Sequence, residues 1–170
     1  MGDVRLIVAT GFHLIAIVAW LGLLLYSAIL FFPSISTVAG SARAQYLIDY
    51  RRKAIIVTLV SVVIFAITGY ALITMNENDQ GIGNVFANRW TAQIFAKHVV
   101  ILIMIILEIW VLFVSLPKLI RTSRRLADNK EQANASLDSQ LVGTVRQNQI
   151  ASIALSFLGA VVLFLVAALP

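Results

Sequence analysis

The chain has 170 residues, of which 60% are hydrophobic and 12% are charged, a composition typical of a single-domain integral membrane protein. It contains no cysteine, which excludes disulfide bonds, thiolate metal sites and cysteine nucleophiles. The net charge of +5 comes from basic residues that flank apolar segments, so it indicates contact with lipid headgroups rather than with nucleic acid. We therefore expect the lipid bilayer as a partner, and no nucleic acid.

Four continuous apolar segments are each long enough to cross a bilayer as a helix, which takes about 20 residues. They span about residues 6–32, 53–75, 91–116 and 150–169. The first and third are expected to end at Pro33 and Pro117, because proline interrupts a helix. The segments are too long and too uniformly apolar for barrel strands. The sequence predicts an all-α, integral membrane four-helix bundle over residues 1–170, with one long cytoplasmic loop at about 118–147.

Positive charge is concentrated on one side of the predicted bundle. Only Arg5 and Arg89 flank the helix ends on the other side. Because positive charge beside membrane spans is retained in the cytoplasm, we expect a multi-pass protein of the plasma (inner) membrane with both termini outside. The residues of the basic side are Arg43, Arg51, Arg52, Lys53, Lys118, Arg121, Arg124, Arg125, Lys130 and Arg146.

The only two histidines, His13 and His98, both lie within apolar segments. His13 follows Arg5 by eight residues and His98 follows Arg89 by nine, so each ring is expected about 12 Å below its flanking arginine. Ionisable side chains in a membrane normally face the bundle interior. We therefore expect the two imidazoles to face each other at equal depth, as the axial ligands of a haem b do.

Further residues are assigned to the same expected site. Gly69 leaves room for a flat macrocycle, while Lys97 reaches toward the outer surface, where it helps to neutralise the propionates. Copper is a weaker alternative, since Met75 and Met104 do not complete a soft ligand set. The full expected haem-binding set is His13, His98, Lys97, Trp20, Gly69, Arg5 and Arg89, with His13 and His98 as metal ligands.

A haem-free interpretation of the histidines stays open. In that interpretation each ring makes an interhelical hydrogen bond, with Thr68, Thr10 or Tyr70 as its partner.

Glu108 is a second ionisable residue to be explained. It is about 16 Å along the helix axis from Lys97, too far for an ion pair. We expect it to contact Thr58 or Ser61 of the second segment, in preference to forming part of a proton route.

Each of the four segments has a short motif within or beside it: His13, Trp20, Gly22 and Pro33 at the first, Arg51, Arg52, Thr68 and Gly69 at the second, Trp90 and Lys97 at the third, and Arg146 and Asn148 before the fourth. Together these motifs resemble the copper-resistance D (CopD) superfamily, which includes haem-binding, four-helix membrane protoporphyrinogen oxidases. The resemblance implies a haem site at His13 and Lys97. The arginine and second histidine that close the first helix of the oxidases are absent here, and His98 adjoins Lys97, which favours a bis-histidine site.

The sequence thus predicts a membrane b-type haem protein that transfers electrons as a subunit of, or partner to, a larger redox complex. Three alternatives remain: a protoporphyrinogen-oxidase-like enzyme, a CopD-like copper transport protein and a haem-free packing subunit. An electron carrier or subunit is favoured over a stand-alone enzyme, and the choice between His98 and Lys97 as second axial ligand stays open.

Overall fold

The computed structural model describes residues 4–38, 40–76, 88–128 and 135–167, and within these ranges the chain is helical apart from short turns, with no strand. The elements are α1 (Val4–Tyr26), a π-helical turn η1 (Ser27–Phe31), α2 (Phe32–Ile35), α3 (Gly40–Thr74), α4 (Arg89–Trp110), a second π-helical turn η2 (Val111–Ser115), α5 (Leu116–Asp128) and α6 (Ala135–Ala167).

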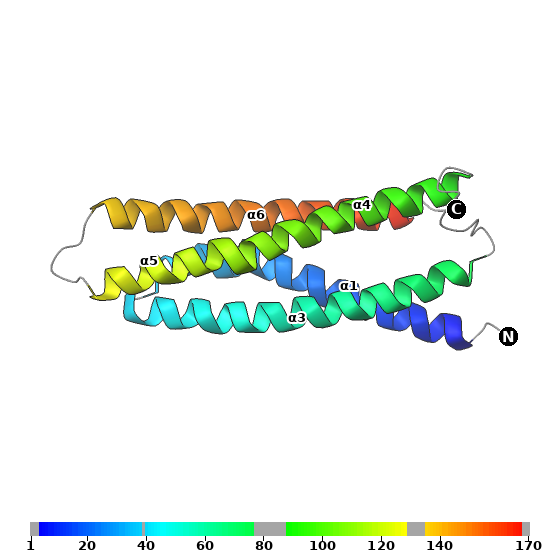
Figure 1. The fold of residues 1–170 in the computed structure, drawn as a ribbon, viewed down its shortest axis with the longest axis horizontal. Helices are drawn as coiled ribbons and strands as arrows, with labels where there is room; N and C mark the ends of the chain where they lie inside the picture. The colour runs from blue at the N-terminus through cyan, green and yellow to red at the C-terminus, as the bar shows by residue number, and fades with distance from the viewer. Residues whose placement is uncertain (1–3, 39, 77–87, 129–134, 168–170) are drawn as a thin grey trace.

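These elements form four rods that run alternately up and down (Figure 1). We call the end where α1 and α4 begin and α3 and α6 finish the terminal end, and the opposite end, which holds α2 and α5, the basic end. All four rods are long and apolar enough to cross a membrane. The predicted all-helical, four-span architecture is therefore confirmed at the level of helix length and composition.

The helices extend further at the basic end than hydropathy indicated. α3 begins at Gly40, whereas the second span was expected to begin at about residue 53. Likewise, α6 begins at Ala135, whereas the fourth span was expected to begin at about residue 150. Residues 118–128 and 135–147 of the expected loop are helical, while 129–134 lie outside the described residues. The reason is that these segments are amphipathic: they bury residues such as Leu47, Leu119 and Leu141 against one another, which a hydropathy window does not register.

The third rod alone has 40 residues, or about 60 Å of helix, against a hydrocarbon core of about 30 Å. The third rod is therefore about twice as long as a hydrocarbon core is thick, and its charged part, α5, lies at the basic end.

The sequence predicted that helices end at Pro33 and Pro117, and this prediction is wrong. Both prolines lie inside helical elements, α2 and α5. Each follows a π-helical turn, in which Phe32 N–H bonds to Ser27 O and Leu116 N–H bonds to Val111 O. A proline ring crowds the carbonyl four residues before it and offers no N–H. The wider π turn relieves this conflict, so the rod continues through the proline.

The turn at η2 leaves one buried carbonyl without a partner in its own helix. Leu112 O would bond to the N–H of Leu116 in an α-helix, but that group is bound to Val111 O; its π-helical partner would be Pro117, which has no N–H. Arg51 of α3 supplies the donor, because its Nε lies 2.6 Å from Leu112 O. Its guanidinium also lies 5.3 Å from the centre of the Phe113 ring, a cation–π contact.

Replacing Arg51 with methionine should therefore lower the stability of the bundle by about 1–3 kcal/mol, because the Leu112 carbonyl stays buried without a donor. The measurement is the thermal unfolding midpoint of the purified protein in detergent. Arg52→Met is the matched control, since Arg52 is exposed and its loss removes the same charge. Equal midpoints for the two variants would contradict the role given to Arg51.

Candidate functional site

Near the terminal end, α4 diverges from α1 and α3 (Figure 1), and two cavities lie between these helices. The first, of about 230 Å³, is the histidine cavity, because His13 and His98 both line it. The second, of about 220 Å³, is the apolar cavity, bounded by α1, α4 and α6 with Phe65 and Leu72 of α3. His13, Phe65, Lys97 and Ile101 line both, so the two spaces flank a single cluster of side chains.

His13 has a defined tautomer. Its Nδ1 lies 2.8 Å from Thr68 Oγ1, and the Thr68 hydroxyl donates to Ile64 O at 2.6 Å. Because that hydroxyl proton is already used, Thr68 accepts from His13, and the neutral ring carries its proton on Nδ1. The ring also stacks on Phe65, with 4.4 Å between centroids. Nε2 is left with a lone pair, and the ring orientation is fixed on two sides.

His98 has the same tautomer for a simpler reason. Its Nδ1 lies 2.6 Å from Ile94 O in the preceding turn, and a carbonyl only accepts, so Nδ1 donates and Nε2 is free. Histidines that bind metals usually donate their other ring nitrogen to such a carbonyl or hydroxyl. Both histidines therefore line one cavity with Nδ1 engaged, and in the neutral ring Nε2 carries the lone pair.

We expected both histidine rings to face the bundle interior, and this holds better for His13 than for His98. His13 is half-buried, whereas His98 is exposed on the wall of its cavity. Successive residues of an α-helix point about 100° apart, so Lys97 and His98 cannot be equally buried on α4. Lys97 takes the more buried position, and His98 lines only the histidine cavity.

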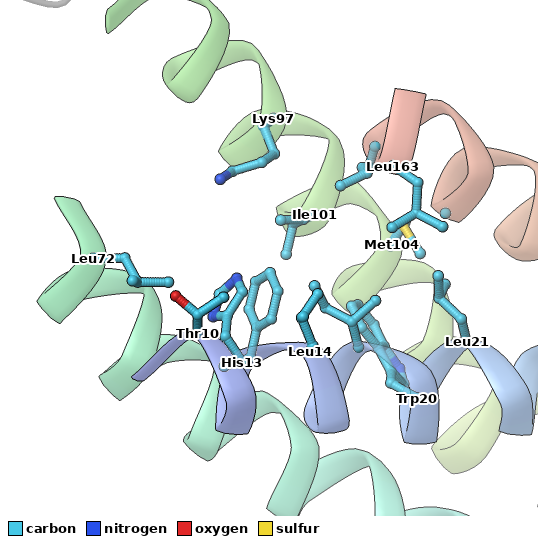
Figure 2. A pocket seen from close by; sticks show the side chains of 14 residues that line it. Thr10, His13, Leu14, Trp20, Leu21, Leu72, Lys97, Ile101, Met104 and Leu163 are labelled. Atoms are coloured by element: carbon cyan, nitrogen blue, oxygen red, sulfur yellow. The ribbon is translucent and has the colours of Figure 1, made fainter. Parts of the chain in front are cut away.

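Lys97 extends from α4 on the side of the apolar cavity where His13 and Thr10 of α1 lie (Figure 2). It lines both cavities, and no hydrogen bond or ion pair to it is seen among the residues that the structure describes. An ammonium group in apolar surroundings is costly unless it is paired or neutral. Lys97 is therefore a third nitrogen-bearing side chain at the cavity that His13 and His98 line.

Gly69 has a different role from the expected one. A Cβ at this position would lie 3.2 Å from His13 Cε1, so the missing side chain makes room for the His13 ring itself. Gly69 also lines the histidine cavity.

Arg5 and Arg89 are exposed in the first turns of α1 and α4, at the terminal end. They are therefore placed at the end of the bundle nearer the two cavities.

The described residues provide few possible ligands for a copper or zinc ion. Nowhere in them do three or more His, Cys, Asp or Glu side chains gather in a possible metal cluster. Met75 is exposed at the end of α3 and lines neither cavity, while Met104 lines only the apolar one.

Glu108 is the centre of a buried hydrogen-bond network deeper in the bundle. Thr58 Oγ1 donates to Glu108 Oε1 at 2.6 Å, as the interhelical interpretation of Glu108 predicted. Trp20 Nε1 donates to Oε2, so the carboxyl joins α1, α3 and α4. The Trp20 contact was not predicted, although an indole N–H in an apolar span needs an acceptor and Glu108 is the one carboxyl of the apolar segments.

Comparisons with protein-family models, with curated proteins and with solved structures find no match to this chain. The class of protein is therefore the one that the fold itself defines: an all-helical bundle with four helices able to span a membrane. The resemblance to the copper-resistance D superfamily stays a prediction from the sequence.

The Trp20–Glu108 hydrogen bond should be measurable as an energetic coupling between the two residues. We expect Trp20→Phe and Glu108→Leu to destabilise the protein by less together than the sum of their separate effects, because either change alone already breaks the bond. For a hydrogen bond inside a membrane bundle the difference should be about 0.5–2 kcal/mol. Unfolding in detergent measures it, and strictly additive effects would mean that the contact contributes no stability.

Proposed function

We propose that this chain is a membrane b-type haem protein that transfers electrons, as a subunit of, or partner to, a larger redox complex. One observation carries the proposal: His13 and His98 line the same cavity with their Nδ1 atoms engaged and their Nε2 atoms free. Neutral imidazole nitrogen is a suitable axial ligand for haem iron.

The chemistry of the residues at the histidine cavity supports this proposal. His13 and His98 would be the ligands, and a bound haem would supply a one-electron redox centre. Thr68 holds the His13 tautomer and Phe65 fixes the plane of its ring. Arg5 and Arg89 would provide positive charge for the propionates at the terminal end.

A second candidate is favoured by the direction of Lys97. Because it points toward His13 (Figure 2), a haem held by His13 and Lys97 is an alternative arrangement, and it is the one that the protoporphyrinogen-oxidase resemblance implies. In that case the chain would be an enzyme that oxidises a porphyrinogen-like reductant. No contact among the described residues favours copper transport.

Absorption spectra of the purified protein, oxidised and reduced with dithionite, test this proposal. Wild-type protein from haem-replete cells should show a low-spin b-type spectrum. His13→Ala and His98→Ala should each abolish it or convert it to high spin, while Lys97→Ala should leave the iron ligation intact.

Loss of the low-spin spectrum in Lys97→Ala, with His98→Ala unchanged, would instead establish the His13–Lys97 arrangement. A colourless wild-type protein would refute the haem assignment.

We also propose that the protein lies in the plasma membrane with its terminal end outside and its basic end in the cytoplasm. The distribution of charge supports this orientation, since positive residues beside spans are retained in the cytoplasm.

Reporter fusions check this orientation. A fusion at Pro170 should give an extracytoplasmic signal, and a fusion near Asn129 a cytoplasmic one, because the two positions follow opposite ends of the bundle. The reverse pair of signals would overturn the orientation and, with it, the placement of the propionate-binding arginines at the outer surface.

A further inference from the structure

The apolar cavity is a separate space with its own walls. On α6 it is lined by Gly159, Val162 and Leu163, none of which reaches the histidine cavity. Its inner limit is the close packing of α1 on α6, where Leu21 occupies the space that a side chain at position 159 would need. The cavity thus extends along α1 from Thr10 to Leu21, a rise of about 16 Å.

The apolar cavity opens on the lateral surface of the bundle, between α1 and α6. Leu14 of α1 and Leu163 of α6 both line it, yet their side chains are 54% and 44% exposed. Exposed leucines on a helix of this hydropathy face the acyl chains of the bilayer. A lipid-soluble molecule can therefore reach the cavity without passing through water.

Two polar groups of the apolar cavity lie at the side nearer the terminal end of the bundle. The Thr10 hydroxyl, beside Leu72, and the Lys97 ammonium both lie at this end of the cavity lining (Figure 2), and neither has a hydrogen-bond partner in the described part of the chain. Further in, Trp20 Nε1 is already bound to Glu108. The cavity therefore offers two unused donors at one end and a long apolar surface below them.

We propose that the apolar cavity binds a lipid-soluble molecule whose head carries acceptor oxygens, either a quinone carbonyl or a fatty-acid carboxylate. The head accepts hydrogen bonds from Lys97 and Thr10, and the apolar body lies between α1, α4 and α6, with its tail leaving between Leu14 and Leu163. The inference rests on the proposed function in one respect, because it assigns the haem to the histidine cavity and leaves this space for a second ligand.

Calorimetric titration of the full-length protein in nanodiscs, with protein-free nanodiscs as the blank, tests the proposal. One titrant is a decyl-substituted benzoquinone and the other is hexadecanoate, so the two sources of the acceptor head are distinguished. Saturable binding of either supports the site. Thr10→Val should weaken that binding about two- to tenfold, since one hydrogen bond is lost.

Two matched tryptophan substitutions separate the cavities. Leu163→Trp fills the apolar cavity from α6 and should weaken binding of the probe at least tenfold, while leaving the haem spectrum unchanged. Leu102→Trp fills the histidine cavity and should disturb the haem spectrum while leaving probe binding unchanged.

The outcomes keep the two proposals apart. A colourless protein that binds a probe in a Leu163-dependent way refutes the haem assignment and supports the second site. A haem-containing protein that binds neither probe above the blank, or binds one equally well after Leu163→Trp, overturns the second site. It is also overturned if Leu163→Trp removes the haem spectrum, since the haem would then occupy the apolar cavity.

Discussion

Hydrocarbon offers no hydrogen bonds, so every polar group within the spanning part of a chain must find its partner inside the protein. Much of the local structure of this bundle follows from that constraint. The prolines force two turns to widen, and the carbonyl freed at Leu112 is bound by an arginine from the neighbouring rod. The indole of Trp20 and the hydroxyl of Thr58 converge on the carboxyl of Glu108. These contacts each join different rods, so satisfying the polar groups also fixes how the rods pack.

The same constraint gives meaning to the polar atoms that remain unused. His13 and His98 each satisfy one ring nitrogen and leave the other facing a cavity. Lys97, between two cavities, has neither an acid nor a carbonyl bound to it among the described residues. Interior groups of this kind are expensive in a membrane and mark functional positions. Because they are concentrated near the terminal end, we propose cofactor and ligand binding there, away from the Glu108 network.

Much of this fold was predictable from the sequence, because continuous apolar segments specify spanning helices directly. The helical extensions at the basic end were missed, since residues 118–128 and 135–147 are amphipathic and their apolar faces are too sparse for a hydropathy average. At the site, the pairing of Glu108 with Thr58 and the alternative pairing of His13 with Thr68 followed from matching depths on adjacent rods. The exposed position of His98 could not be predicted in this way. Counting residues from the end of a helix gives the height of a side chain along the axis, but not the direction in which it points.

The two π-helical turns change which residues of a rod lie on the same face. Each is equivalent to one residue inserted into an α-helix, so it changes the angular phase of everything that follows by about 100°. A helical wheel drawn without interruption from α4 into α5 therefore assigns the wrong face to every residue after Leu116. The basic end of the third rod is in register with its neighbours only because of that extra residue. Shortening η2 by one position, even with Pro117 removed, would swing the buried side of α5 into water and its arginines toward α3 and α6.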